Sequence, residues 1–168
     1  MYHVSDHRHR PQPVRVSKYM TDPGSYVISP AVMKTHDRAV LTLSLKNIVV
    51  GSLKKDVGSV WGRPETGAND KFTSHGGPNN EAIHYNLFSL AKAARPHLAI
   101  IDGLTGMEGN GPVNGTAVDH KVAIASTDFL AADRLGTELM GIDFQKVGYL
   151  AFCARAGMGP VSYTHLNL

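Results

Sequence analysis

Apolar residues along the chain recur with two periods, and the alternation of these periods predicts strands interleaved with helices. Short apolar runs bounded by turn residues predict buried strands at 25–33, 97–102 and 121–126. Apolar positions at helical spacing predict helices at 79–96, 127–141 and 144–157. Strands that alternate with helices are typical of an α/β layered fold, so we expect a mainly parallel sheet flanked by helices.

One apolar run fits both periods. In residues 38–51, RAVLTLSLKNIVVG, Leu41, Leu45 and Ile48 share a helical face. Leu41, Leu43 and Leu45 equally fit the alternation of a strand. The run ends in a glycine, as a C-capped helix does, so we expect a helix.

The predicted elements divide the chain into three parts. Residues 1–24 are polar and broken by prolines, which predicts a flexible N-terminal arm. Residues 25–160 form the α/β domain, with long Gly-rich connections expected at 51–79 and 103–115. Residues 161–168 match no periodic pattern and resemble a non-native tail, so they carry no functional weight.

Composition then narrows the function classes. The chain of 168 residues suits one domain, and its net charge of +3 is scattered rather than gathered in the basic stripe that nucleic acid requires. No apolar run approaches the ~20 residues that span a bilayer, and the N-terminus lacks a signal-like apolar region, so we expect no membrane partner and a cytoplasmic location. Cys153 is the only cysteine, which excludes an iron–sulfur cluster ligated within this chain.

Polar side chains follow the predicted strands. Lys34 and His36 come after the first strand, Asp102 ends the second, and Asp128 follows the third. Because the carboxyl ends of parallel strands meet at one edge of a sheet, we expect these groups to converge. Lysine does not belong in a core, since an unpaired buried charge is costly. Lys46 and Asn47, at the C-terminal end of the stretch 33–47, are therefore expected either at a solvated end of an element or at the same anion-binding edge.

The second glycine-rich stretch, DGLTGMEGNGPVNG, lies beside this edge. Successive exposed N–H groups at Gly109, Asn110 and Gly111 fit an anion-binding nest, although the stretch matches neither the Walker nor the dinucleotide pattern. Glu108 is the only carboxylate among these glycines. It is either a solvated loop residue or, near Lys34, a general acid or base.

For the other two carboxylates, a purely structural role stays open. Asp102 before a glycine is ordinary turn chemistry, and Asp128 suits the first turn of a helix. A metal held by Asp102, Glu108 and a histidine is compatible with the sequence, but no spacing demands it.

Several strings together resemble the domain-of-unknown-function 362 family over residues 25–159. The matching strings are SYVISPAVMKTH, LSLKN, IDGLTGMEGNGPVNGT, VAIASTDFLAADRLG and MGID, in the order of the family. The resemblance implies an α/β domain whose activity is not established. Some members are similar to iron–sulfur proteins, but the cysteine module of those members is absent from this chain.

We therefore expect a domain that binds a small anionic metabolite or cofactor. The expected catalytic groups are Lys34, His36, Asp102 and Glu108, and the expected ligand-binding groups are Lys46, Asn47, Gly109, Asn110, Gly111 and Asp128. Acid–base or metal-assisted chemistry would suit this set, but the sequence does not decide whether the domain is an enzyme or which cofactor it uses. The alternative is a non-catalytic accessory module that works with an iron–sulfur electron-transfer protein.

Overall fold

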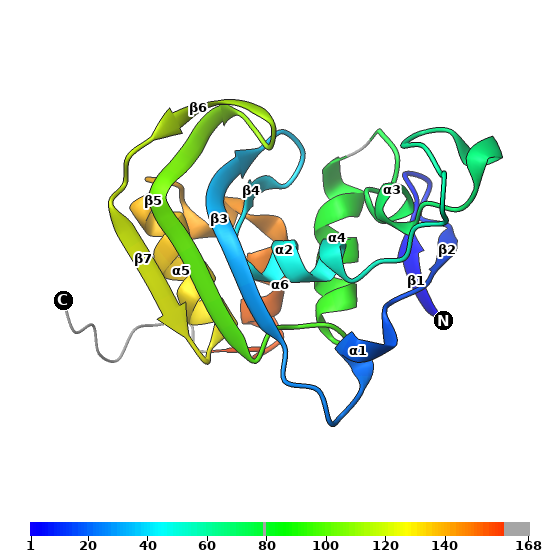
Figure 1. The fold of residues 1–168 in the computed structure, drawn as a ribbon, viewed down its shortest axis with the longest axis horizontal. Coiled ribbons are helices and arrows are strands. Elements are labelled where there is room, and N and C mark those ends of the chain that lie inside the picture. The colour runs from blue at the N-terminus through cyan, green and yellow to red at the C-terminus, as the bar shows by residue number, and fades with distance from the viewer. Residues whose placement is uncertain (79, 160–168) are drawn as a thin grey trace.

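A computed structural model describes residues 1–78 and 80–159 as a curved sheet packed on helices, with a smaller hairpin lobe beside it (Figure 1). The strands are β1 (Tyr2–Ser5), β2 (Pro11–Val14), β3 (Ile28–His36), β4 (Val40–Thr42), β5 (Leu98–Asn110), β6 (Asn114–Val118) and β7 (Val122–Ser126). The α-helices are α1 (Lys18–Thr21), α2 (Ser44–Gly51), α3 (Asp70–Ser74), α4 (Asn80–Ala91), α5 (Phe129–Leu139) and α6 (Gly148–Arg155). Two short 3₁₀ turns are η1 (Pro64–Thr66) and η2 (Phe144–Lys146).

The main sheet confirms the α/β class but not the expected strand directions. Its five strands run β4-β3-β5-β6, and β7 also pairs with β5. Only β3 and β5 are parallel, whereas the β3–β4, β5–β6 and β5–β7 pairs are antiparallel. The expectation of a mainly parallel sheet is therefore wrong, because tight connections join β3 to β4 and β5 to β6, and such turns allow only antiparallel pairing.

The three predicted strands all lie in this sheet, but the second is longer than expected. β5 continues through Asp102 to Asn110, so the stretch 103–115 is mostly a β-hairpin formed with β6 rather than a loop. The glycines made it look like a loop. In the structure Gly103, Gly106 and Gly115 instead sit where an added Cβ would meet neighbouring atoms at 2.3–2.8 Å, so they permit close packing inside the sheet.

The ambiguous run divides between the two structures that its pattern allowed. Its first part forms β4, which pairs with β3, and its second part forms α2, so the single predicted helix is wrong for residues 40–42. Leu41, Leu43 and Leu45 are all fully buried, which explains why both periods fitted. The pairing of Leu41 with Thr35 across the β3–β4 turn is a tertiary preference that overrides local propensity.

The predicted helices are present with small shifts. α4 lies within 79–96, with Asn79 outside the described residues, and α5 lies within 127–141. Asp128, rather than Ser126 or Thr127, caps α5, because its Oδ1 accepts the Ala131 N–H at 2.8 Å. The last predicted helix becomes η2 followed by α6.

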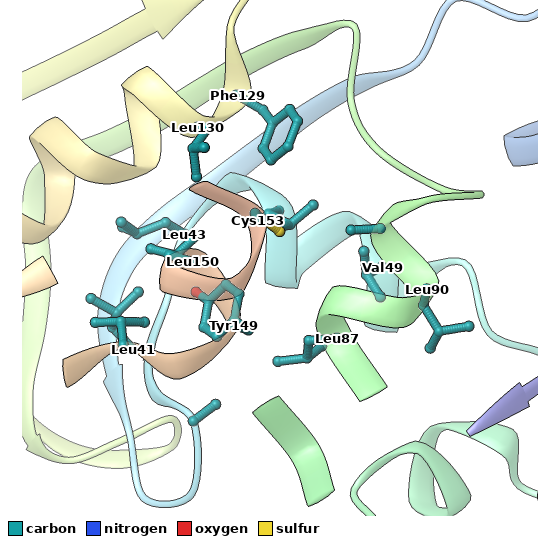
Figure 2. Close-up of a cluster of buried hydrophobic side chains, with 14 of the residues drawn as sticks. Leu41, Leu43, Val49, Leu87, Leu90, Phe129, Leu130, Tyr149, Leu150 and Cys153 are labelled. Atoms are coloured by element: carbon teal, nitrogen blue, oxygen red, sulfur yellow. The ribbon is translucent and has the colours of Figure 1, made fainter. Parts of the chain in front are cut away.

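The core lies between the sheet and the helices α2, α4, α5 and α6, as Figure 2 shows. Leu41 and Leu43 come from the β4 region, Leu130 from α5, and Tyr149 from α6, and all four are fully buried. Cys153 is buried among them and packs as a small hydrophobic residue, and burial raises the pKa of its thiol to about 12.

The N-terminal segment is better packed than its sequence suggests. β1 and β2 form an antiparallel hairpin whose Val4 and Val14 are buried. The Ser5 N–H donates to Asn86 Oδ1 of α4 at 2.6 Å, and the Asn86 amide donates back to Ser5. Residues 1–14 therefore do not form an unpacked arm, because α4 supplies the apolar contacts that the segment lacks by itself. The predicted tail at 161–168 lies outside the described residues.

The helices α2 and α5 lie against one face of the sheet, and α6 packs on α4 and α5 (Figure 1). The other face of the sheet carries exposed apolar side chains. Ile28 and Val32 of β3, and Ile100 and Leu104 of β5, are each more than a third exposed. Alternation along the strands turns these residues away from the helices.

Candidate functional site

A cavity of about 320 Å³ opens where the end of β3 meets α2 and α3. It is lined by Lys34, His36, Thr42, Lys46, Asn47, Val50, Gly51, Trp61, Lys71, His75 and Pro112. These residues include three lysines and two histidines but no carboxylate. The lining therefore has the charge that favours an anion.

The cavity brings together four residues that the sequence predicts for the site. Lys34 and His36 come from the end of β3, and Lys46 and Asn47 come from α2. They meet because the β3–β4 turn folds the chain back, so that α2, which follows β4, lies beside β3.

A buried carboxylate holds the start of α2 in place. Asp133 of α5 is fully buried, and its oxygens accept the Ser44 N–H at 2.8 Å, the Ser44 hydroxyl at 2.5 Å and the Leu45 N–H at 3.0 Å. These bonds satisfy the free N–H groups that begin every helix. Burial raises the pKa of Asp133 to about 6, although the hydrogen bonds oppose this. Asp133 thus fixes the helix that carries Lys46.

Lys46 is the most unusual residue of the cavity. Its side chain is only 5% exposed, yet its ammonium makes no hydrogen bond or ion pair with any described residue. Burial, followed by repulsion from Lys34, lowers its pKa to about 8. Thr42 adds a second unsatisfied group, because its hydroxyl is buried and has no hydrogen-bond partner among the described residues.

His36 is neutral near pH 7 and its tautomer follows from its partners. The backbone N–H groups of Arg38 and Ala39 approach Nδ1 at 3.1 and 3.2 Å, so this atom accepts and the proton lies on Nε2. Burial, followed by the charge of Lys46, lowers the pKa of His36 to about 4. The contact of Nδ1 with Asp37 at 3.0 Å is therefore not an ion pair at neutral pH.

The cavity also contains residues that sequence reasoning missed. The Nδ1 atom of His75 lies 2.6 Å from the Lys71 carbonyl oxygen, so Nδ1 donates and Nε2 keeps a lone pair. Burial is the main cause that lowers the pKa of His75 to about 4. Trp61 packs edge-on against the His75 ring at 4.9 Å. Trp61, Lys71 and His75 all lie in the long connection 51–79. The length of this connection was the only signal in the sequence that it carries function.

Asn47 has a different task from the one expected. Its amide nitrogen donates to Pro30 O at 2.9 Å and to Ser29 Oγ at 3.2 Å. Both amide protons are thus used to attach α2 to β3, and only the side-chain oxygen remains for a ligand.

The three predicted nest residues form the tip of the β5–β6 hairpin. Gly109 O accepts from Thr35 Oγ1 at 3.0 Å, and Gly111 O accepts from the Asp37 N–H at 3.0 Å. A Cβ on Gly111 would lie 2.2 Å from Thr35 O, so only glycine permits this approach. Gly109, Asn110 and Gly111 do not line the cavity themselves, but they place Pro112 at its wall.

The three predicted carboxylates lie outside the cavity. Asp102 sits within β5, where its Oδ1 accepts the Leu104 N–H, and Asp128 caps α5. β7 is antiparallel to β5 and brings Ser126 beside Ala99, so Asp128 lies near the opposite end of the sheet. Lys34 pairs with Met107, and strand alternation therefore turns Glu108 toward the other face. Asp102 and Glu108 make no hydrogen bond or ion pair with the cavity lysines in the described part of the chain.

Two alternative sites fit less well. A larger cavity of about 540 Å³ lies between the N-terminal hairpin and α3, but its carboxylate Asp6 already binds Arg10 and the Arg8 N–H. Within residues 1–78 and 80–159, no group of three or more histidine, cysteine or carboxylate side chains is arranged to hold a metal ion. The Lys46 cavity is thus the best-supported candidate.

Comparisons with known proteins agree with the resemblance seen in the sequence. The family described as a domain of unknown function (DUF362) matches residues 4–138, so the match takes in most of the N-terminal hairpin but ends before residues 139–159 of the resemblance. A thylakoid-associated protein from Synechocystis sp. is 30% identical over 154 residues, which are 89% of this chain but 42% of that protein. No solved structure matches the chain.

Proposed function

We propose that this chain, which belongs to the DUF362 family, binds a small anion in the cavity around Lys46. The observation that carries the proposal is Lys46, a residue that is only 5% exposed and whose ammonium lines the cavity without a counter-charge among the described residues. Lys46 lies beside Lys34 and Lys71 in a lining without carboxylates, and a buried charge without a partner is costly. A bound anion would remove that cost.

The donors available suggest the kind of anion. The three lysine ammonium groups supply charge, and the Nε2–H of His36 and the hydroxyl of Thr42 supply hydrogen bonds. Trp61, Val50 and Pro112 add apolar walls. This combination fits a small metabolite that carries a carboxylate or a phosphate on a short carbon skeleton. Asp102 and Glu108 have no part in the proposed site.

Binding of inorganic phosphate and of lactate tests this proposal directly. We expect both to bind the protein, as measured by calorimetry, and Lys46→Met to weaken binding by about 10–100-fold, because a charge-assisted hydrogen bond contributes ~1.5–3 kcal/mol. Lys146→Met is the matched control, because Lys146 is exposed in η2 and does not line the cavity. Equal affinities for wild type and Lys46→Met would reject the site.

The accessory role remains the second candidate. The observation that favours it is the uncovered apolar face of the sheet, where Ile28, Val32 and Leu104 are exposed. The chain spans 42% of its relative's length, so the activity of the whole protein is itself a matter of proposal. If an iron–sulfur protein docks here, Val32→Asp should remove co-purifying iron from the full-length protein, whereas Lys46→Met should not.

We also propose that the protein is located in the cytoplasm. None of the helices in the described ranges has the length and apolar character that a bilayer crossing needs. The relative is named for its association with thylakoids, which makes attachment to a membrane surface the alternative. Fractionation of cells that express the full-length protein distinguishes the two locations.

A further inference from the structure

Lys46 can relieve its burial in two ways. It can hold a counter-ion, as proposed above, or it can lose its proton and become a neutral amine. Several groups on the neighbouring elements decide between the two. Lys34 of β3 and the burial of the side chain disfavour the ammonium, while Asp37 in the β3–β4 turn, which is exposed, favours it more weakly.

The resulting amine has the setting of a nucleophile. A desolvated lysine next to a second cation has a larger neutral fraction near pH 7 than an exposed lysine does. Its pKa of about 8 agrees with this geometry. The cavity also holds neutral imidazoles at His36 and His75, whose rings lie 6.0 Å apart. The site therefore combines an amine, proton carriers and anion-binding cations in one open cavity.

We propose that Lys46 Nζ forms an imine with the carbonyl carbon of a small oxo acid, whose carboxylate lies against Lys34 and Lys71. This inference rests on the proposed anion site, because the carboxylate is what holds the carbonyl group beside Lys46. The cavity volume of about 320 Å³ suits a short-chain oxo acid, and Trp61 and Val50 offer apolar contacts for that chain.

The chemistry balances with groups of this cavity. The neutral amine of Lys46 attacks the carbonyl carbon, and one proton moves from nitrogen to the former carbonyl oxygen, which gives a carbinolamine. The Nε2 lone pair of His75 is free to accept and return that proton, since its Nδ1 donates to the Lys71 carbonyl. The carbinolamine then takes up one proton at its hydroxyl, the C–O bond breaks, and water leaves. The nitrogen lone pair then forms the C=N bond, which gives a protonated imine. The imine therefore carries the same single positive charge as the lysine ammonium did before it lost its proton.

Thr42 gives a second reason to place the carbonyl group here. Its hydroxyl is buried, lines the cavity and has no partner among the described residues. A hydroxyl in this position is expected to donate to the carbonyl oxygen or to the carbinolamine. The groups left unsatisfied in the structure thus match the groups that the adduct would need.

Reductive trapping tests the inference. The protein is incubated with pyruvate and sodium cyanoborohydride, and the modified lysines are identified by peptide mass mapping. We expect Lys46 to carry on the order of tenfold more label than Lys146 at pH 7, because its amine is more often neutral. Label at Lys46 should increase with pH around its pKa of about 8. Equal or smaller labelling of Lys46 would overturn the inference.

Two further arms separate this inference from the anion site. Inorganic phosphate should compete with pyruvate, and Lys34→Met should reduce labelling by pyruvate more than labelling by the neutral aldehyde propanal. If phosphate binds with the Lys46 dependence given above but Lys46 is not trapped, the anion site stands and the imine fails. If propanal and pyruvate label Lys46 equally and phosphate does not compete, the oxo-acid assignment and the anion site both fail.

Discussion

Two largely buried ionisable residues lie near the start of α2, and they differ in whether the protein supplies hydrogen-bond partners for them. Asp133 is fully buried and accepts three hydrogen bonds from Ser44 and Leu45. Lys46 is nearly as buried, but its ammonium has no partner among the described residues. The first arrangement is complete within the fold, whereas in our proposal a bound anion completes the second.

The comparison separates a buried charge that the fold itself satisfies from one that the described part of the fold leaves without a partner. A buried polar group that is satisfied by the protein contributes to folding, and its removal leaves its partners without bonds. A buried charge that the protein leaves unsatisfied costs stability, and it persists where it serves binding or chemistry. The two residues should therefore respond in opposite directions to substitution.

The largest effect is expected at Asp133. Asp133→Ala leaves two helix N–H groups and the Ser44 hydroxyl unsatisfied in the core, so it should lower the free energy of unfolding by about 3–5 kcal/mol. Urea denaturation measures this loss. Asp128 is the half-buried N-cap of α5, the helix that also contains Asp133. Asp128→Ala should lower the free energy of unfolding by only about 1 kcal/mol. Similar losses for both variants would break the contrast.

The next effect is a pH dependence that comes from the cavity histidines. His36 and His75 have folded pKa values of about 4 against an ordinary value of 6.5, so the unfolded chain binds more protons between these values. Stability should therefore fall as the pH is lowered from 6.5 to 4, by at most about 3 kcal/mol for each histidine.

Asp133 opposes this trend, because its raised pKa of about 6 makes the folded state bind more protons than the unfolded state between pH 3.8 and 6. His75→Gln should make the acid loss shallower, as measured by urea unfolding at several pH values. An unchanged slope would show that His75 titrates normally in the folded protein.

A smaller effect of opposite sign is expected at Lys46. Lys46→Met replaces an unpaired buried cation by an apolar side chain of similar length, so the free energy of unfolding at pH 7 should stay equal or rise by about 1–3 kcal/mol. The difference should shrink between pH 8 and 10.5, where the folded wild type has lost its charge before the unfolded chain does. Thermal denaturation at pH 7 and pH 10 measures both. A clear destabilisation at pH 7 would mean that Lys46 is paired after all.

The smallest effect is expected at the carboxylates that lie outside the cavity. Glu108→Gln and Asp102→Asn should each change the affinity for phosphate less than about twofold, which is within ~0.4 kcal/mol. Calorimetry compares them with the loss expected for Lys46→Met. A tenfold change at Glu108 would place it back in the site and would reopen the proposed division of roles.

The sequence predicted a substantial part of this molecule. The strands at 25–33, 97–102 and 121–126 share one sheet, and the helices within 79–96 and 127–141 are present. These elements follow from hydrophobic periodicity, which survives folding because burial decides it. The polar ends of the apolar run around Lys34 and Lys46 also pointed correctly to one place in the structure.

The errors have a common cause. The glycines of 103–115 predicted a loop, and the ambiguous run 38–51 predicted one helix, because local propensity does not report the partner strand. Asp128 was placed at the same edge as Lys34 on the assumption of parallel strands, and the antiparallel direction of β7 moves it to the other end.

The sequence by itself determined which apolar positions face the core, where the longer helices and strands lie, and that lysines bracket an apolar segment. Only the tertiary structure decided that Lys46 lacks a partner among the described residues, that Asp133 has three hydrogen bonds, and that His75 joins the site from a distant connection. The physical reason is that the apolar pattern of an element is local, whereas the satisfaction of a buried charge depends on which segments, far apart along the chain, fold against it.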